Sequence, residues 1–127
     1  MDLSNIYRGI IIVHPHGDMI VNGTKSIIIK SKKYFDCTDN KLLLIQNKQA
    51  LGIIVINYIG SLDIQGFKKK FNQHRITEQE RKKWWKNKRK LYQYNIDVNH
   101  IFRKPIHIDY PQGPQNFVKP ENIKAMQ

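Results

Sequence analysis

Short runs of Ile, Leu and Val recur through the first half of this chain, and they constrain its fold more than any other feature. The runs cover residues 10–13, 27–29, 42–45 and 53–56, and polar or turn-forming residues separate them. Apolar runs of this length are typical of buried β-strands, and they are too short for a membrane span or for the core of a secretory signal. The first half of the chain is therefore predicted to form a β-sheet.

Six strands are expected along the chain, over residues 7–14, 24–30, 42–46, 51–59, 91–98 and 103–109. Residues 47–50 join the third and fourth strands as a hairpin, and Pro105 places the sixth strand at a sheet edge. A short helix is expected at residues 18–23, capped by Asp18 and ended by Gly23 in the left-handed conformation. The tail is expected to fray after Lys119.

Residues 61–90 have a different character, because the β-branched runs stop and basic residues crowd together. Thr77 and Glu80 have the spacing of a capping box, so a helix is predicted from there to about Lys88. Strands combined with a helical insertion predict a single α+β domain over residues 1–127, built on a small closed or nearly closed barrel with two or three flanking helices.

Positive charge dominates the same segment. The chain has 22 Lys and Arg against 10 Asp and Glu, a net charge of +12, and residues 65–90 hold 11 of these cations. Lysines and arginines neutralise phosphates, and an exposed tryptophan can stack on a base. We expect Trp84 to pack inward and Trp85 to be partly exposed; the alternative is one solvated helix face with a core tryptophan. The expected nucleic-acid contacts are Lys68, Lys69, Lys70, Arg75, Arg81, Lys82, Lys83, Trp85, Lys86, Lys88 and Arg89.

A second candidate site follows the short helix. Backbone amides near Gly23 and the ammonium group of Lys25 would receive a phosphate or a carbonyl oxygen, although an ordinary helix-to-strand turn explains the same residues. The order of elements over residues 6–110, with His14 and Pro15 after the first strand, resembles the ASCH domain of the PUA-like superfamily. The Gly-x-Lys-Thr-x-Glu-x-Arg motif of that family is kept in part, with Gly23, Lys25, Ser26 for threonine, Ile28 for glutamate and Lys30 for arginine.

This resemblance implies a PUA-like β-barrel of five to six strands and a cleft between barrel and helices that binds RNA or a modified nucleoside. The expected cleft residues are His14, Gly23, Lys25, Ser26 and Lys30. Some relatives are ribonucleases or act as amidohydrolases on acetylated cytidine, so a hydrolase that uses Lys25, Ser26 and Asp18 is the alternative. Because the aliphatic Ile28 cannot act as acid, base or nucleophile, we expect a reader of RNA rather than a catalyst.

The remaining expectations concern partners and location. RNA is expected over DNA, with a larger RNA-processing or transcription complex as a further partner, and docking to an acidic protein or anionic membrane is the third alternative. A lone cysteine and the absence of a secretory signal predict an intracellular protein, cytoplasmic or nuclear. The abundance of Lys, Ile and Asn is typical of AT-rich genomes, including those of many large DNA viruses.

Two further groups of residues are candidate binding sites. His14 and His16 with Cys37 or His74 would be metal ligands only in an extended segment, and no standard ligand spacing supports them, so no metal or cofactor is expected. Near the C-terminus two aromatic residues flank three amides, a mixture that can stack on a base and read its edge; the alternative is a loop pinned by Phe117. These residues are Tyr110, Gln112, Gln115, Asn116 and Phe117.

Overall fold

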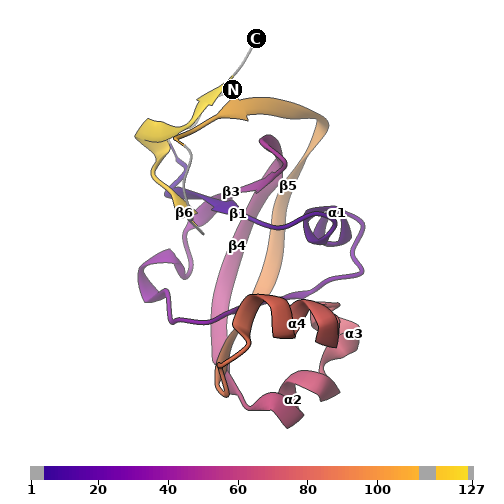
Figure 1. Cartoon of the computed structure of the whole chain (residues 1–127). Helices are drawn as coiled ribbons and strands as arrows, with labels where there is room; N and C mark the ends of the chain where they lie inside the picture. The colour runs from indigo at the N-terminus through magenta and orange to yellow at the C-terminus, as the bar shows by residue number, and fades with distance from the viewer. Residues whose placement is uncertain (1–4, 112–116, 126–127) are drawn as a thin grey trace.

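The computed structural model describes residues 5–111 and 117–125 (Figure 1). Its strands are β1 (Arg8–Ile11), β2 (Ile27–Lys30), β3 (Lys41–Gln46), β4 (Gln49–Leu62), β5 (Leu91–Asp109), β6 (Phe117–Val118) and β7 (Lys124–Ala125). Its helices are α1 (His16–Val21), α2 (Ile64–Lys69), α3 (Phe71–His74) and α4 (Glu78–Trp85), with 3₁₀ helices η1 (Phe35–Cys37) and η2 (Pro120–Asn122). In this part of the chain no helix is long and apolar enough to cross a membrane.

The strands form one curled half-barrel sheet in the order β2-β5-β4-β3-β1-β6, and β7 pairs with β5. Among the strands of the described residues, β1 and β3 are the one parallel pair, and the other strand pairs are antiparallel. β4 and β5 run side by side through the molecule, and α2, α3 and α4 gather at one end of them (Figure 1). The predicted α+β fold with a nearly closed barrel is confirmed.

The predicted hairpin between β3 and β4 is present, with its turn at Asn47 and Lys48. Both residues have positive φ angles, 52° and 59°. Two-residue hairpin turns of this kind match the twist of the strands, and asparagine tolerates the left-handed conformation well.

The sixth predicted strand is not a separate element, because β5 continues from Leu91 to Asp109. Its pairing with β4 is irregular: Ile101 faces Gly52, whereas Ile106 faces Ala50. The extra residues between Ile101 and Ile106 form a bulged stretch that contains Pro105. A bulge accommodates proline, which cannot donate a ladder hydrogen bond, so the chain bends there without ending the strand.

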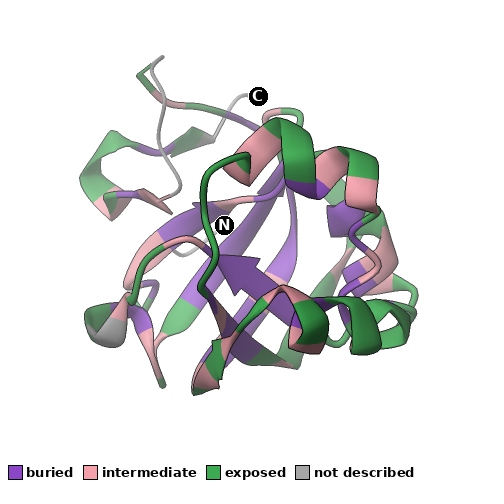
Figure 2. Ribbon diagram, turned by 60° about the horizontal axis from the view of Figure 1, so that its bottom comes forward, coloured by how far each residue is buried: buried purple, intermediate pink, exposed green. Residues whose placement is uncertain are grey.

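β2 explains how the core is divided. Ile27 and Ile29 pack with Phe67 and Ile76 beneath the helices, whereas Ile28 faces the other way into the barrel core. Alternate side chains of a strand point to opposite faces, and an uninterrupted isoleucine run buries both of them. Figure 2 shows these buried strands at the centre of the molecule and the exposed outer faces of the helices.

Of the two predicted helix caps, the one of α4 is confirmed and the one of α1 is wrong. The capping box is present, since the Thr77 hydroxyl accepts from the Glu80 amide at 3.1 Å and Glu80 Oε1 accepts from the Thr77 amide at 2.9 Å. α1, in contrast, starts after Pro15 and has no side-chain cap. Asp18 lies inside this helix, so its predicted capping role is wrong; Gly23 does adopt the predicted positive φ, 86°.

α4 ends at Trp85 rather than at Lys88. Lys82, Lys86 and Lys90 would lie four residues apart on a longer helix, and like charges at this spacing destabilise a helix. Residues 86–90 are all exposed, so no apolar packing compensates for that repulsion. The result is a turn of exposed basic residues that leads into β5.

The tail is more ordered than the sequence analysis predicts. η2 and β7 follow Lys119, and β7 pairs with the end of β5. Ile123 is buried with Leu43, Ile45 and Ile108, and this single apolar anchor accounts for the order of a segment that otherwise reads as polar.

Candidate functional site

A cleft lies where the half-barrel stays open. Among the described strands, β2 pairs only with β5 and ends the sheet on one side. β1, with the short β6 beyond it, lies near the other end and does not pair with β2. The cleft between them has a volume of about 190 Å³, and α4 contributes one wall. Its lining comprises Ile11, Ile12, Val13, His16, Lys25, Ile28, Ile29, Lys30, Ser31, Ile76, Trp84 and Trp85. Pockets for drug-sized ligands measure roughly 300–1,000 Å³, so this cleft suits one small ring system.

Lys25 lies in the wall of the cleft, with 5% of its surface exposed. Its ammonium group donates a hydrogen bond to the backbone carbonyl of His74. Burial lowers the pKa of Lys25 to about 7; the negative charge of Glu80 opposes this shift, and the positive charge of Lys30 adds to it. Near neutral pH Lys25 therefore exchanges readily between a charged donor and a neutral amine.

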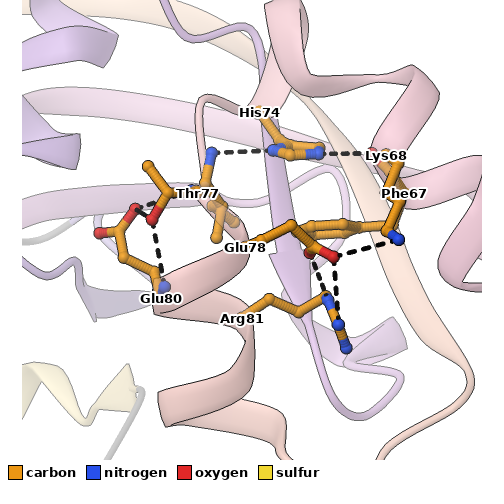
Figure 3. Close-up of polar contacts among 8 residues, drawn as sticks. Phe67, Lys68, His74, Thr77, Glu78, Glu80 and Arg81 are labelled. Carbon is orange, nitrogen blue, oxygen red and sulfur yellow. Dashed lines mark hydrogen bonds and ion pairs between the residues drawn. The ribbon is translucent and has the colours of Figure 1, made fainter.

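His74 fixes the carbonyl group that Lys25 contacts. Its Nδ1 accepts from the Ile76 amide at 2.9 Å, so Nε2 carries the proton and donates to the Phe67 carbonyl at 2.7 Å (Figure 3). The ring also stacks on Phe67, with centroids 4.1 Å apart. Burial lowers the pKa of His74 to about 4, and the neutral imidazole is thus committed to a structural role.

His16 and Glu80 meet at the other side of the cleft. His16 Nε2 lies 2.9 Å from Glu80 Oε2, and His16 is 3% exposed. Burial lowers the pKa of His16, and Lys25 adds to this effect while Glu80 opposes it. Burial disfavours the charged form of Glu80, but the Thr77 amide and His16 outweigh that effect and hold its pKa below the usual range. Near neutral pH we infer a protonated Nε2 on a neutral imidazole that faces a carboxylate.

Lys30 is the second buried lysine of the cleft. Burial lowers its pKa to about 8, and its ammonium group lies 5.5 Å from the ring centroid of Phe117. Lys25 and Lys30 are thus two expected cleft residues that the structure brings together.

The other three expected cleft residues lie outside the cleft lining. His14 is exposed, 3.5 Å from the carboxylate of Asp18. Gly23 is exposed and has no heavy atom near the position a Cβ would take. Ser26 is exposed as well, and its backbone bonds Gln73 and Ile96. Alternate residues of an extended segment point to opposite sides, so Lys25 faces inward and Ser26 outward.

This arrangement does not assemble the alternative hydrolytic set, since Ser26 and Asp18 are exposed and do not line the cleft. Ile28 does line the cleft, in the place of the motif glutamate. The carboxylate that contacts the cleft-lining His16 is Glu80, for which the sequence predicts only a capping role. Glu80 lies 64 residues from His16, and no sequence spacing signals such a contact.

The two tryptophans are alike in their surroundings. Both are half-buried and both line the cleft, and their ring centroids are 5.5 Å apart. Trp84 meets His16 edge-on at 5.6 Å, and Trp85 meets Phe67 edge-on at 6.4 Å. Trp85 is partly exposed, as predicted, but Trp84 is not packed fully inward, because α4 lies along the cleft and presents both rings to it.

The expected basic surface divides into paired and exposed groups. Arg81 is buried and binds Glu78 with two hydrogen bonds of 2.5 and 3.2 Å, and Lys68 lies 3.4 Å from the same carboxylate (Figure 3). Lys70 donates to Gln93 and Arg75 to the Thr24 carbonyl. Within residues 65–90, all of which the structure describes, the exposed cations with no such contact are Lys69, Lys82, Lys83, Lys86, Lys88, Arg89 and Lys90. Six of these seven cations lie on α4 and the turn after it.

The remaining candidate residues are the cysteine, the possible metal ligands and the C-terminal aromatic and amide residues. Cys37 is buried, and burial raises its pKa to about 11. Within residues 5–111 and 117–125, no group of three or more His, Cys, Asp or Glu side chains could hold a metal ion. Phe117 packs on Tyr34 at 4.7 Å. Gln112, Gln115 and Asn116 lie outside the described residues.

Solved structures share this fold. Three crystal structures of an ASCH protein from Zymomonas mobilis superpose on the chain. The protein itself has a TM-score of 0.73 and 16% sequence identity, and the match covers 91% of this chain and 88% of that chain. A serine-to-alanine mutant has a TM-score of 0.74, 15% identity and the same coverages, and a tyrosine-to-phenylalanine mutant has a TM-score of 0.72, 16% identity and coverages of 89% and 88%. No protein-family model and no curated protein matches the sequence. The chain has the fold of an ASCH domain, as its partial motif predicts.

Proposed function

We propose that this chain is a nucleic-acid-binding module, with RNA as its polymer, that holds one base in the cleft and neighbouring phosphates on α4. One observation carries the proposal: two tryptophans and two buried lysines line a single small cleft. Stacking of a base on an aromatic ring contributes roughly 1–3 kcal/mol, and lysine ammonium groups donate to the carbonyl oxygens of a base edge.

The exposed lysines support the second half of the proposal. Lys82 and Lys83 lie on α4 beside the tryptophans, and Lys86, Lys88 and Arg89 follow directly. Cations placed this way neutralise the backbone of a strand whose base enters the cleft. A module of this kind suits the reading of a modified base, alone or within a larger RNA-processing or transcription complex.

A hydrolase in the same cleft is the second candidate. The observation that favours it is the electrostatic coupling of Lys25 to Glu80, since an amine with a pKa near 7 and a nearby carboxylate are suited to proton transfer. The absence of Ser26 and Asp18 from the cleft lining weighs against the particular set of residues that the sequence suggests.

The test compares binding to polyanions of different chemistry. A labelled 12-nucleotide single-stranded RNA, the same sequence as DNA, polyglutamate and anionic lipid vesicles are titrated with the protein at several salt concentrations. The proposal predicts tightest binding to RNA. Preference for polyglutamate or vesicles would favour a docking module instead. Product from RNA or N4-acetylcytidine, with or without divalent metal, that vanishes in Lys25→Ala would promote the hydrolase.

A further inference from the structure

A second group of aromatic rings lies close to the cleft, on β4 and β5. The half-buried rings of Tyr58 and Tyr92 are 6.3 Å apart, and Tyr58 rests on the buried Tyr94 at 5.5 Å. The ammonium group of the exposed Lys33 lies 5.9 Å from the Tyr58 centroid and 5.7 Å from that of Tyr92. Two rings and a cation thus share one small area of the surface.

Two partly buried hydrogen bonds hold this arrangement in place. The hydroxyl of Tyr94 accepts from the Tyr34 amide at 2.8 Å and donates to the Lys32 carbonyl at 3.0 Å. Tyr94 therefore fastens the loop on both sides of Lys33 to the barrel. A loop anchored in this way keeps its lysine beside the rings at little entropic cost.

The rings adjoin the cleft directly. Lys30, which lines the cleft, is the register partner of Tyr92 across the β2–β5 ladder. Side chains that face each other across such a ladder lie on the same face of the sheet, and neighbouring strands are about 4.7–4.9 Å apart. A ligand that leaves the cleft past Lys30 and Ser31 therefore meets Tyr92 next.

We propose that Tyr58 and Tyr92 form a stacking site for a second nucleotide of a single-stranded RNA whose neighbouring base occupies the cleft, with Lys33 on the phosphate between them. This inference rests on the proposed RNA-binding function and extends it from one base to a path along the strand. Lys33 is exposed, so its ammonium group can turn from the rings to a phosphate while a base takes the ring face.

Charge complementarity favours a polyanion over a protein partner here. Lys32 and Lys33 are exposed beside the rings, and the exposed Lys88, Arg89 and Lys90 precede the start of β5 by a few residues. Aromatic rings with one cation against them and further exposed cations close in the sequence suit the bases and phosphates of a single strand.

The experiment uses the full chain and a 12-nucleotide single-stranded RNA that carries 5-iodouridine, which crosslinks to aromatic side chains on irradiation. Crosslinked peptides are mapped by mass spectrometry, and affinities are measured for Tyr92→Leu, Tyr92→Phe and Lys33→Ala. Lys48→Ala and Lys41→Ala are the controls, because Lys48 lies 5.4 Å from the Tyr110 ring in the same kind of contact outside the cleft lining, and Lys41 is an exposed lysine of β3.

The proposal predicts crosslinks at Tyr58 or Tyr92 and an affinity at least about five-fold weaker for Tyr92→Leu. Tyr92→Phe and both controls should bind as the wild type does. RNA binding that depends on Trp84 but gives no tyrosine crosslinks, with Tyr92→Leu unchanged, would overturn this site alone. A wild-type chain that binds no RNA would overturn the proposed function and this site together. If Tyr92→Leu fails to fold, the wild-type crosslink map decides.

Discussion

His16 Nε2 lies 2.9 Å from Glu80 Oε2, and this contact joins α1 to α4 at a residue that lines the cleft. Glu80 also closes the capping box of α4 through Thr77. One carboxylate thus sets both where α4 begins and how it lies against the barrel, and the positions of Trp84 and Trp85 follow from this placement.

Glu80→Ala should lower the free energy of unfolding by about 1–3 kcal/mol, because it leaves the buried imidazole of His16 without its partner. Glu80→Gln should cost less, since glutamine also serves in a capping box and can accept a hydrogen bond. Urea unfolding measures both. Glu121→Ala, an exposed acidic residue of η2, is the control and should change stability by less than about 0.5 kcal/mol. Equal effects at positions 80 and 121 would refute the structural role of the contact.

Stability should rise with pH just above neutrality. Lys25 has a pKa of about 7 in the folded chain against an ordinary value of 10.5, so in this window the unfolded chain binds more protons. The free energy of unfolding then increases with pH, by up to about 1.4 kcal/mol per pH unit for one proton. Lys30, with a pKa of about 8, also makes the free energy of unfolding increase with pH, over a higher pH range. Urea unfolding between pH 6.5 and 8.5 tests this.

Lys25→Met should flatten that rise, whereas Lys41→Met, at an exposed position in β3, should keep the wild-type slope. Parallel curves for the wild type and Lys25→Met would show that Lys25 keeps its charge in the folded protein.

RNA affinity should fall steeply with salt. Each phosphate neutralised on a single strand releases about 0.7 counterion, so replacing Lys82, Lys83 and Lys86 with alanine should reduce the log–log slope by up to about 2 units. A control triple removes Lys104, Lys119 and Lys124, which are exposed and lie outside α4 and the turn after it. The same change in slope for both triples would mean that binding has no fixed footprint on α4.

Trp84→Leu and Trp85→Leu should both weaken RNA binding, because both rings line the cleft. Neither should destabilise the fold by the roughly 3–5 kcal/mol typical of emptying a core tryptophan site, since both are half-buried and leucine retains part of the packing. Thermal melts and anisotropy titrations separate the two effects. If Trp85→Leu loses binding and Trp84→Leu does not, Trp84 does not contact the RNA and has a purely structural role.

The sequence predicted the elements of the fold well, because the apolar runs are short and the turn residues are clear. It did not predict that β5 would continue through Pro105, since a bulge depends on its partner strand. The end of α4 was also misplaced: the capping box marks a helix start, but here repulsion among lysines decides where the helix stops.

The candidate site was less predictable. The family motif predicts Lys25 and Lys30 in the cleft, whereas Gly23 and Ser26 of the same motif, and His14 before it, lie outside the cleft lining. The contact of His16 with Glu80 joins segments 64 residues apart, and only tertiary packing creates it. Arg81 lies in a basic run that suggests phosphate binding, yet its side chain is occupied by Glu78.

The most direct test is a fluorescence titration, because the chain has two tryptophans and both line the cleft. Single-stranded RNA is added while tryptophan emission and the anisotropy of the labelled RNA are followed together. The account predicts saturable quenching with the same midpoint as the anisotropy change. It also predicts at least about five-fold weaker binding for Lys25→Met, as expected for a lost hydrogen bond to a charged group. Saturating anisotropy with unchanged tryptophan emission would place the RNA elsewhere and contradict the assignment of the cleft.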